Sequence, residues 1–165
     1  MTTRYVHTNL VAEDWRRLAS FYVEVFGCVP VPPERHLSGE WLDRATSLEG
    51  ARIDGVHLRL PGHGEHGPTL EVFQYSTGES GSGAQADRKG FGHIAFSVCD
   101  VHAMAERIVR HGGCLLGEIV TREIPGAGML TFAYAVDPEE NIVEIQSWER
   151  PGPVSREESV RQRER

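Results

Sequence analysis

The length, composition and charge of the chain limit the classes of protein to which it can belong. It has 165 residues, of which 39% are hydrophobic, and this suits one globular domain or two small fused modules. A net charge of −7 without a basic stripe argues against nucleic acid as a partner. We expect a cytoplasmic protein with no membrane partner, because the sequence shows no signal-peptide run, no membrane-length apolar stretch and no CxxC spacing among its three cysteines.

The first half of the sequence predicts a strand, a helix and further strands, in that order. Asp14 is a suitable N-cap for a helix whose apolar residues recur every three or four positions as far as Phe26. Prolines keep residues 29–33 extended but exclude them from the centre of a sheet, and residues 35–51 suggest a short helix or lid. Alternating apolar residues predict strands at residues 5–11, 52–60 and 69–75.

The second half repeats this order after a segment rich in glycine and serine. Residues 79–90 have the composition of a flexible linker. Asp100 is a suitable N-cap for the next predicted helix, which ends near His111. Strands are predicted at residues 92–98, 114–124, 129–136 and 142–148. We therefore interpret the chain as a diverged internal duplication. Its parts are a first module at residues 1–78, a second module at residues 91–149 and a charged tail at residues 150–165.

One histidine and one glutamate occupy corresponding places in each half. His7 and His93 open the first strand of their halves, and Glu71 and Glu144 lie in the last strands, each on the face opposite the apolar one. A buried glutamate is costly unless it is paired or bound to metal, and two imidazoles with two carboxylates suit Zn²⁺, Ni²⁺, Co²⁺, Mn²⁺ or Fe²⁺. A solvated sheet face is the alternative for each residue alone. For His57 the sequence leaves both a cavity and a surface position open.

Other side chains on the same strand faces are candidates for binding a substrate. These candidates are Asn9, Phe73, Tyr75, Gln146 and Trp148. Asn9 lies two residues after His7, and Gln146 lies two residues after Glu144, so each shares a face with a candidate ligand. The aromatic rings indicate an apolar pocket, and packing in the core or in a dimer interface is the alternative.

Several segments resemble the vicinal oxygen chelate superfamily, over roughly residues 4–149. They are His7-Thr-Asn-Leu, Phe21-Tyr-Val-Glu-Val-Phe-Gly27, Leu70-Glu-Val-Phe, Gly92-His-Ile-Ala-Phe-Ser-Val98 and Val136-Asp-Pro-Glu-Glu-Asn-Ile-Val-Glu-Ile145. The superfamily includes glyoxalase I, methylmalonyl-CoA epimerase, extradiol dioxygenases, fosfomycin-resistance enzymes and bleomycin-binding proteins. The resemblance implies an α+β fold in which two βαβββ modules form a curled mixed β-sheet, or half-barrel, around a metal site.

The resemblance also implies a function. The order His7, Glu71, His93, Glu144 is similar to the ligand set of glyoxalase I, so one divalent transition metal per site is expected. The implied chemistry is proton transfer next to a carbonyl of a small-molecule substrate, such as an α-hydroxycarbonyl or a thioester, with Glu71 or Glu144 as the base. A homodimer is expected. The alternatives are a metal-dependent extradiol-type dioxygenase and a non-catalytic protein that binds a drug or another small molecule.

Overall fold

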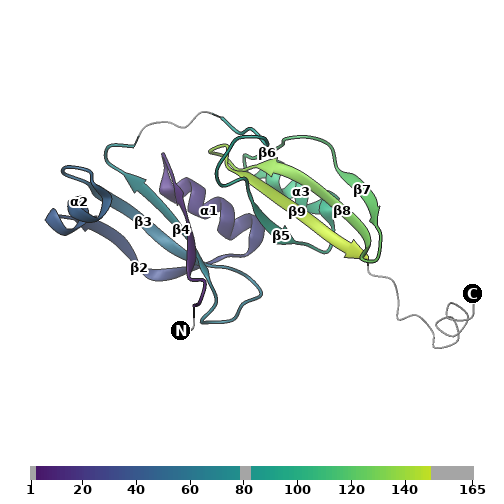
Figure 1. The fold of residues 1–165 in the computed structure, drawn as a ribbon, viewed down its shortest axis with the longest axis horizontal. Coiled ribbons are helices and arrows are strands. Elements are labelled where there is room, and N and C mark those ends of the chain that lie inside the picture. The colour runs from purple at the N-terminus through teal and green to yellow at the C-terminus, as the bar shows by residue number, and fades with distance from the viewer. Residues whose placement is uncertain (1–2, 79–82, 150–165) are drawn as a thin grey trace, which may run out of the picture.

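The strands of the chain form two β-sheets that lie side by side (Figure 1). A computed structural model of the chain describes residues 3–78 and 83–149. The predicted tail at residues 150–165, and residues 79–82 of the predicted linker, lie outside the described residues. Both halves begin with a strand and a helix and continue with strands, and both sheets are mixed, curled and unclosed. The predicted α+β fold is therefore confirmed.

The first sheet is built by the first half of the chain. Its elements are β1 (His7–Val11), α1 (Trp15–Phe26), β2 (Val29–Ser38), α2 (Glu40–Thr46), β3 (Arg52–Arg59) and β4 (Thr69–Tyr75). The strand order is β1-β4-β3-β2, with β1 parallel to β4 and the other neighbours antiparallel. The prolines of β2 lie on an edge strand, because proline cannot donate to a central ladder. Helix α2 provides the short helix expected between residues 35 and 51.

The second sheet repeats this topology. Its half contains β5 (Ile94–Ser97), α3 (Val101–Arg110), β6 (Cys114–Leu115), β7 (Val120–Ile124), β8 (Gly128–Val136) and β9 (Ile142–Glu149). Strand β5 is parallel to β9, and β9 is antiparallel to β8, as β1, β4 and β3 are in the first sheet. Strands β6 and β7 both pair with β8.

The prediction of one continuous strand over residues 114–124 is wrong. Leu115 pairs with Ala135, and Val120 pairs with Phe132. The segment between Leu115 and Val120 is longer than the segment of β8 that it faces. The extra residues cannot stay in register, so the strand divides into β6 and β7.

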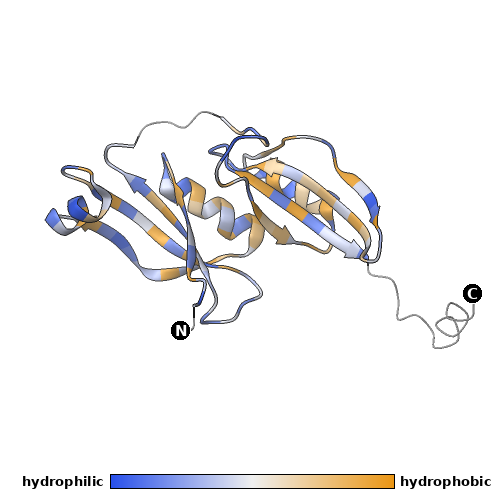
Figure 2. Cartoon of the chain, viewed as in Figure 1, coloured by the Kyte–Doolittle hydropathy of each residue, from blue (hydrophilic) through white to orange (hydrophobic). Residues whose placement is uncertain are grey.

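Helix α1 joins the two halves. Its N-cap Asp14 accepts hydrogen bonds from the backbone N–H groups of Arg16 and Arg17, and Gly27 ends the helix in the left-handed conformation that glycine adopts without strain. The Phe26 ring stacks on Phe96 of β5 with 4.0 Å between centroids. Such contacts make one hydrophobic core that includes buried residues of both sheets, and the strands show the matching alternation of hydrophobic and hydrophilic residues in Figure 2.

Candidate functional site

The first module brings His7 and Glu71 together. The parallel register of β1 and β4 pairs Asn9 with Glu71, and His7 lies two residues earlier on the same face of β1. His7 Nδ1 is 3.4 Å from Glu71 Oε1, and the Asn9 side-chain amide donates a hydrogen bond of 3.3 Å to Glu71 Oε2. Only 8% of Glu71 is exposed, so these neighbours replace much of the water that the carboxylate would otherwise contact.

A second imidazole approaches the same carboxylate from the opposite neighbouring strand. The antiparallel register of β3 and β4 pairs His57 with Glu71, and His57 Nε2 is 3.2 Å from Glu71 Oε1. Burial lowers the pKa of His57, and the Glu71 carboxylate opposes this shift only in part. The sequence left the face of His57 open, and the structure places it beside the candidate site.

The second module brings His93 and Glu144 together. His93 directly precedes β5, and the parallel register of β5 and β9 pairs Ala95 with Glu144. His93 Nε2 is 2.9 Å from Glu144 Oε2. The residue that pairs with Glu144 from the other neighbouring strand is Tyr134, and its ring centroid lies 5.1 Å from that of His93. This module therefore repeats the backbone register of the first module with different side chains around its glutamate.

The four predicted ligands form two separate pairs. Among residues 3–78 and 83–149, no group of three or more histidine, cysteine, aspartate or glutamate side chains is arranged to hold a metal ion. Each pair nevertheless offers one imidazole nitrogen and one carboxylate oxygen, which are donor types that a divalent transition metal accepts. The donor chemistry of each pair thus fits half of a four-ligand site.

The predicted substrate-binding residues divide into two groups. Phe73 is buried in a small cluster with Leu42 of α2, and Tyr75 packs against this cluster. In the second module, the Trp148 indole donates a hydrogen bond of 2.7 Å to Gln146 Oε1, and 40% of Trp148 is exposed. For Phe73 the structure thus favours the alternative of core packing, whereas Asn9 contacts the Glu71 carboxylate.

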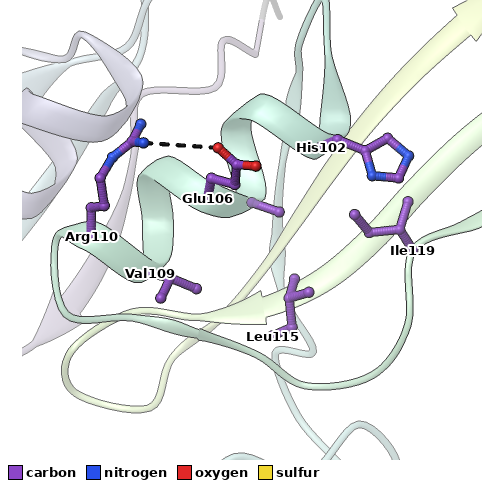
Figure 3. Close-up of a pocket in the computed structure, with 7 residues that line it drawn as sticks. His102, Glu106, Val109, Arg110, Leu115 and Ile119 are labelled. Carbon is purple, nitrogen blue, oxygen red and sulfur yellow. Dashed lines mark ion pairs between the residues drawn. The ribbon is translucent and has the colours of Figure 1, made fainter.

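The surface has two hollows that the candidate ligands do not line. The first, of about 450 Å³, lies beside α3, where Arg110 and Glu106 form an ion pair next to the apolar side chains of Val109, Leu115 and Ile119 (Figure 3). The second, of about 360 Å³, lies between the two halves and is lined by residues of β1 and β5, by Leu70 of β4 and by the loop after β3. None of the four predicted ligands lines either hollow.

Comparison with known proteins identifies the family to which the chain belongs. Residues 4–145 match the model of the glyoxalase/bleomycin resistance protein/dioxygenase superfamily. The match covers most of the chain, so the chain belongs to this superfamily, as the resemblance predicted. No curated protein matches the chain.

Solved structures of low sequence identity share the fold. A glyoxalase family protein from Bacillus cereus is 19% identical, with a TM-score of 0.68 over 88% of this chain and 93% of the other. A glyoxylase/bleomycin resistance protein/dioxygenase domain from Frankia is 18% identical, with a TM-score of 0.60 over 90% and 100%. The fosfomycin resistance protein FosX from Listeria monocytogenes is 17% identical, with a TM-score of 0.58 over 94% and 99%. Within the described residues, no helix is long and apolar enough to cross a membrane.

Proposed function

We propose that the protein is a metal-dependent lyase or isomerase of glyoxalase or epimerase type. The observation that carries this proposal is the repeated pair: a glutamate with little exposure lies next to an imidazole at the same register in both modules. Superfamily membership supports metal chemistry as a class, and the two carboxylates add the groups that a proton transfer needs.

The ligands of one site would come from two copies of the chain. Each pair supplies two donors, whereas a divalent transition metal in a protein commonly has four ligands. A symmetric homodimer would join His7 and Glu71 of one copy to His93 and Glu144 of the other, and its two-fold axis would create two such sites. The metal, when bound, would act as a Lewis acid on a carbonyl of the substrate.

The residues of the chain would then move and hold the proton. Glu71 or Glu144 would accept a proton from the carbon next to the carbonyl. In an α-hydroxycarbonyl the proton would return to the former carbonyl carbon, while the hydroxyl proton moves to the old carbonyl oxygen; in a thioester it would return to the opposite face of the same carbon. The substrates that suit this step are small α-hydroxycarbonyl compounds and thioesters, whose acidic C–H bond lies next to a polarisable oxygen. Asn9, Gln146 and Trp148 are candidates for orienting such a substrate, because Asn9 contacts Glu71 and the other two follow Glu144 on β9.

Solvent-deuterium exchange tests the reaction directly. Protein loaded with Zn²⁺, Ni²⁺ or Co²⁺ is incubated in D₂O with α-hydroxycarbonyl and acyl-CoA compounds, and deuterium at carbon is measured by NMR. We expect exchange in the natural protein and none above background in Glu71→Gln or Glu144→Gln. Glu106→Gln is the matched control, because Glu106 is exposed on α3 and paired with Arg110. No exchange with any of these compounds, or oxygen uptake with a catechol, would contradict the proposal.

A complementation experiment tests whether the site is shared. His7→Ala and His93→Ala should each lose metal binding when purified alone. In a re-associated equal mixture, half of the dimers combine the two variants, and each contains one intact site, so about a quarter of the sites should return. No recovery after subunit exchange, with exchange verified by mass spectrometry, would place all ligands of a site in one chain.

A further inference from the structure

His57 is a half-buried residue beside Glu71 that the proposed ligand set does not use. Its ring is held on several sides. The Thr69 hydroxyl is 3.4 Å from Nδ1, and the Phe73 ring lies edge-on with 5.6 Å between centroids. The His7 ring also lies edge-on, 6.3 Å away. Rotation of the imidazole would break these contacts, so its orientation is set by the sheet.

In this orientation Nε2 lies 3.2 Å from Glu71 Oε1, which is within ion-pair distance. A carboxylate oxygen only accepts, so the nitrogen that faces it must carry the proton. Nδ1 can then accept from the Thr69 O–H, and this contact is compatible with that tautomer. With the Asn9 amide donating to Oε2, each oxygen of Glu71 has a polar neighbour other than His7.

The second module shows that this arrangement is not a simple consequence of the fold. The position that corresponds to His57 by register is Tyr134, and the position that corresponds to Asn9 is Ala95. Neither the alanine nor the tyrosine places an imidazole or an amide against Glu144. The extra donors are therefore specific to Glu71.

We propose that His57 is a positioning residue for Glu71: with Thr69 behind it, it holds the carboxylate in the orientation in which Glu71 and His7 bind the metal. This inference rests on the proposed function, because it assumes that Glu71 is a metal ligand. His57 itself is not a ligand. Groups that hydrogen-bond a ligating carboxylate typically change metal affinity by about 10–100-fold, which sets the size of the expected effect.

Metal titration of the full chain with Co²⁺ and with Zn²⁺ tests this role. His57→Leu removes the donor, and its affinity should fall by about 10–100-fold. His57→Gln keeps a side-chain N–H that can reach the carboxylate, so it should recover most of the loss. Thr69→Val should cause a smaller loss, and it should cause no further loss in the presence of His57→Leu, because the two residues act in series.

The visible spectrum of the Co²⁺ protein separates positioning from ligation. At saturating Co²⁺, His57→Leu should keep the d–d bands of the natural protein, because the number of bound imidazoles does not change. A shifted spectrum would make His57 a ligand and would overturn the inference. Unchanged affinity in His57→Leu would overturn it as well. His102→Leu, an exposed histidine of α3, is the control and should bind as the natural protein does.

The outcomes for the natural protein keep the two proposals apart. Circular dichroism of each variant shows that it is folded before titration. Thr69→Val tests the positioning role of His57 a second time without changing His57 itself. Co²⁺ binding with the expected His57 effect but without deuterium exchange would leave the inference standing and reject the proposed reaction. A natural protein that binds neither metal would overturn both.

Discussion

The two modules follow the same order of elements, but their helices have different structural roles. Helix α1 buries seven side chains and reaches the second half of the chain through Tyr22 and Phe26, whereas α3 buries three. Val109 of α3 is 54% exposed. The two modules thus share a topology, whereas the packing of each helix depends on which neighbour covers its faces.

The surroundings of the two glutamates differ in a similar way. Glu71 contacts two histidines, His7 and His57, and the amide of Asn9. In the described part of the chain, the only histidine or amide side chain in contact with Glu144 is His93. The strand registers around the two glutamates correspond residue by residue. The backbone around the two glutamates therefore corresponds, while the side chains that surround each carboxylate differ.

The unequal packing of the helices predicts the largest difference in stability. Leu18 of α1 is fully buried, and Leu18→Ala should lower the free energy of unfolding by about 2–5 kcal/mol, because it leaves a cavity in the shared core. Val109→Ala on α3 should change it by less than about 0.5 kcal/mol. Urea unfolding followed by circular dichroism measures both. Similar costs at the two sites would mean that α1 is not the more central helix.

The hydrogen bond between the halves predicts an intermediate effect. The Tyr22 hydroxyl donates to Asp137 Oδ2 over 2.9 Å, and Asp137 is 2% exposed. Tyr22→Phe should cost about 1–3 kcal/mol, because a buried acceptor loses a partner. Tyr134→Phe is the matched control in the second module, where the half-buried ring makes a tilted contact with His93 and an edge-on contact with Phe132. The same urea assay applies, and an equal loss in the control would contradict this interpretation.

The pH dependence of stability tests the burial of Asp137. Burial raises the pKa of this carboxyl above its ordinary value of 3.8, so the folded protein binds the proton more tightly than the unfolded chain. The stabilisation that the protonated Asp137 gives to the folded state is therefore complete below pH 3.8, and it is lost as the pH rises through the pKa of the folded protein. The difference in unfolding free energy between the natural protein and Asp137→Asn should decrease over this range. If the difference between the two proteins did not change with pH, the pKa of Asp137 would not be raised by folding.

The smallest expected difference between the two halves is in the reactivity of their cysteines. Cys28 follows α1 and is buried, and burial raises the pKa of its thiol to about 11, whereas Cys99 and Cys114 of the second half are exposed. At pH 8 only about one Cys28 in a thousand would be ionised. Iodoacetamide should therefore modify Cys99 and Cys114 first, as peptide mass spectrometry can show. Rapid labelling of Cys28 in the folded protein would mean that the end of α1 is open.

Features that depend on neighbours in the sequence were predicted well. The caps Asp14 and Asp100, the helix stop at Gly27 and the alternation of the strands all follow from local chemistry, and the structure confirms them. The strand faces of His7, Glu71, His93 and Glu144 were also predicted, but the sequence placed all four around one metal and did not predict that they form two pairs.

Features that depend on pairing between distant segments were not predicted. The division of residues 114–124 follows from the register of β8. The burial of Phe73 follows from Leu42, which α2 brings over the first sheet. The position of His57 follows from its register against Glu71. In each case the deciding contact joins residues that are far apart in the sequence.

The doubled α+β architecture, the superfamily and the strand faces of two histidines and two glutamates could be predicted from sequence alone. Only the tertiary structure decided that these residues form two pairs, that His57 and Asn9 surround one glutamate, and that α1 lies at the junction of the halves. The physical reason is that a two-residue period specifies the face of a strand side chain, whereas its partner is specified by the register of another strand.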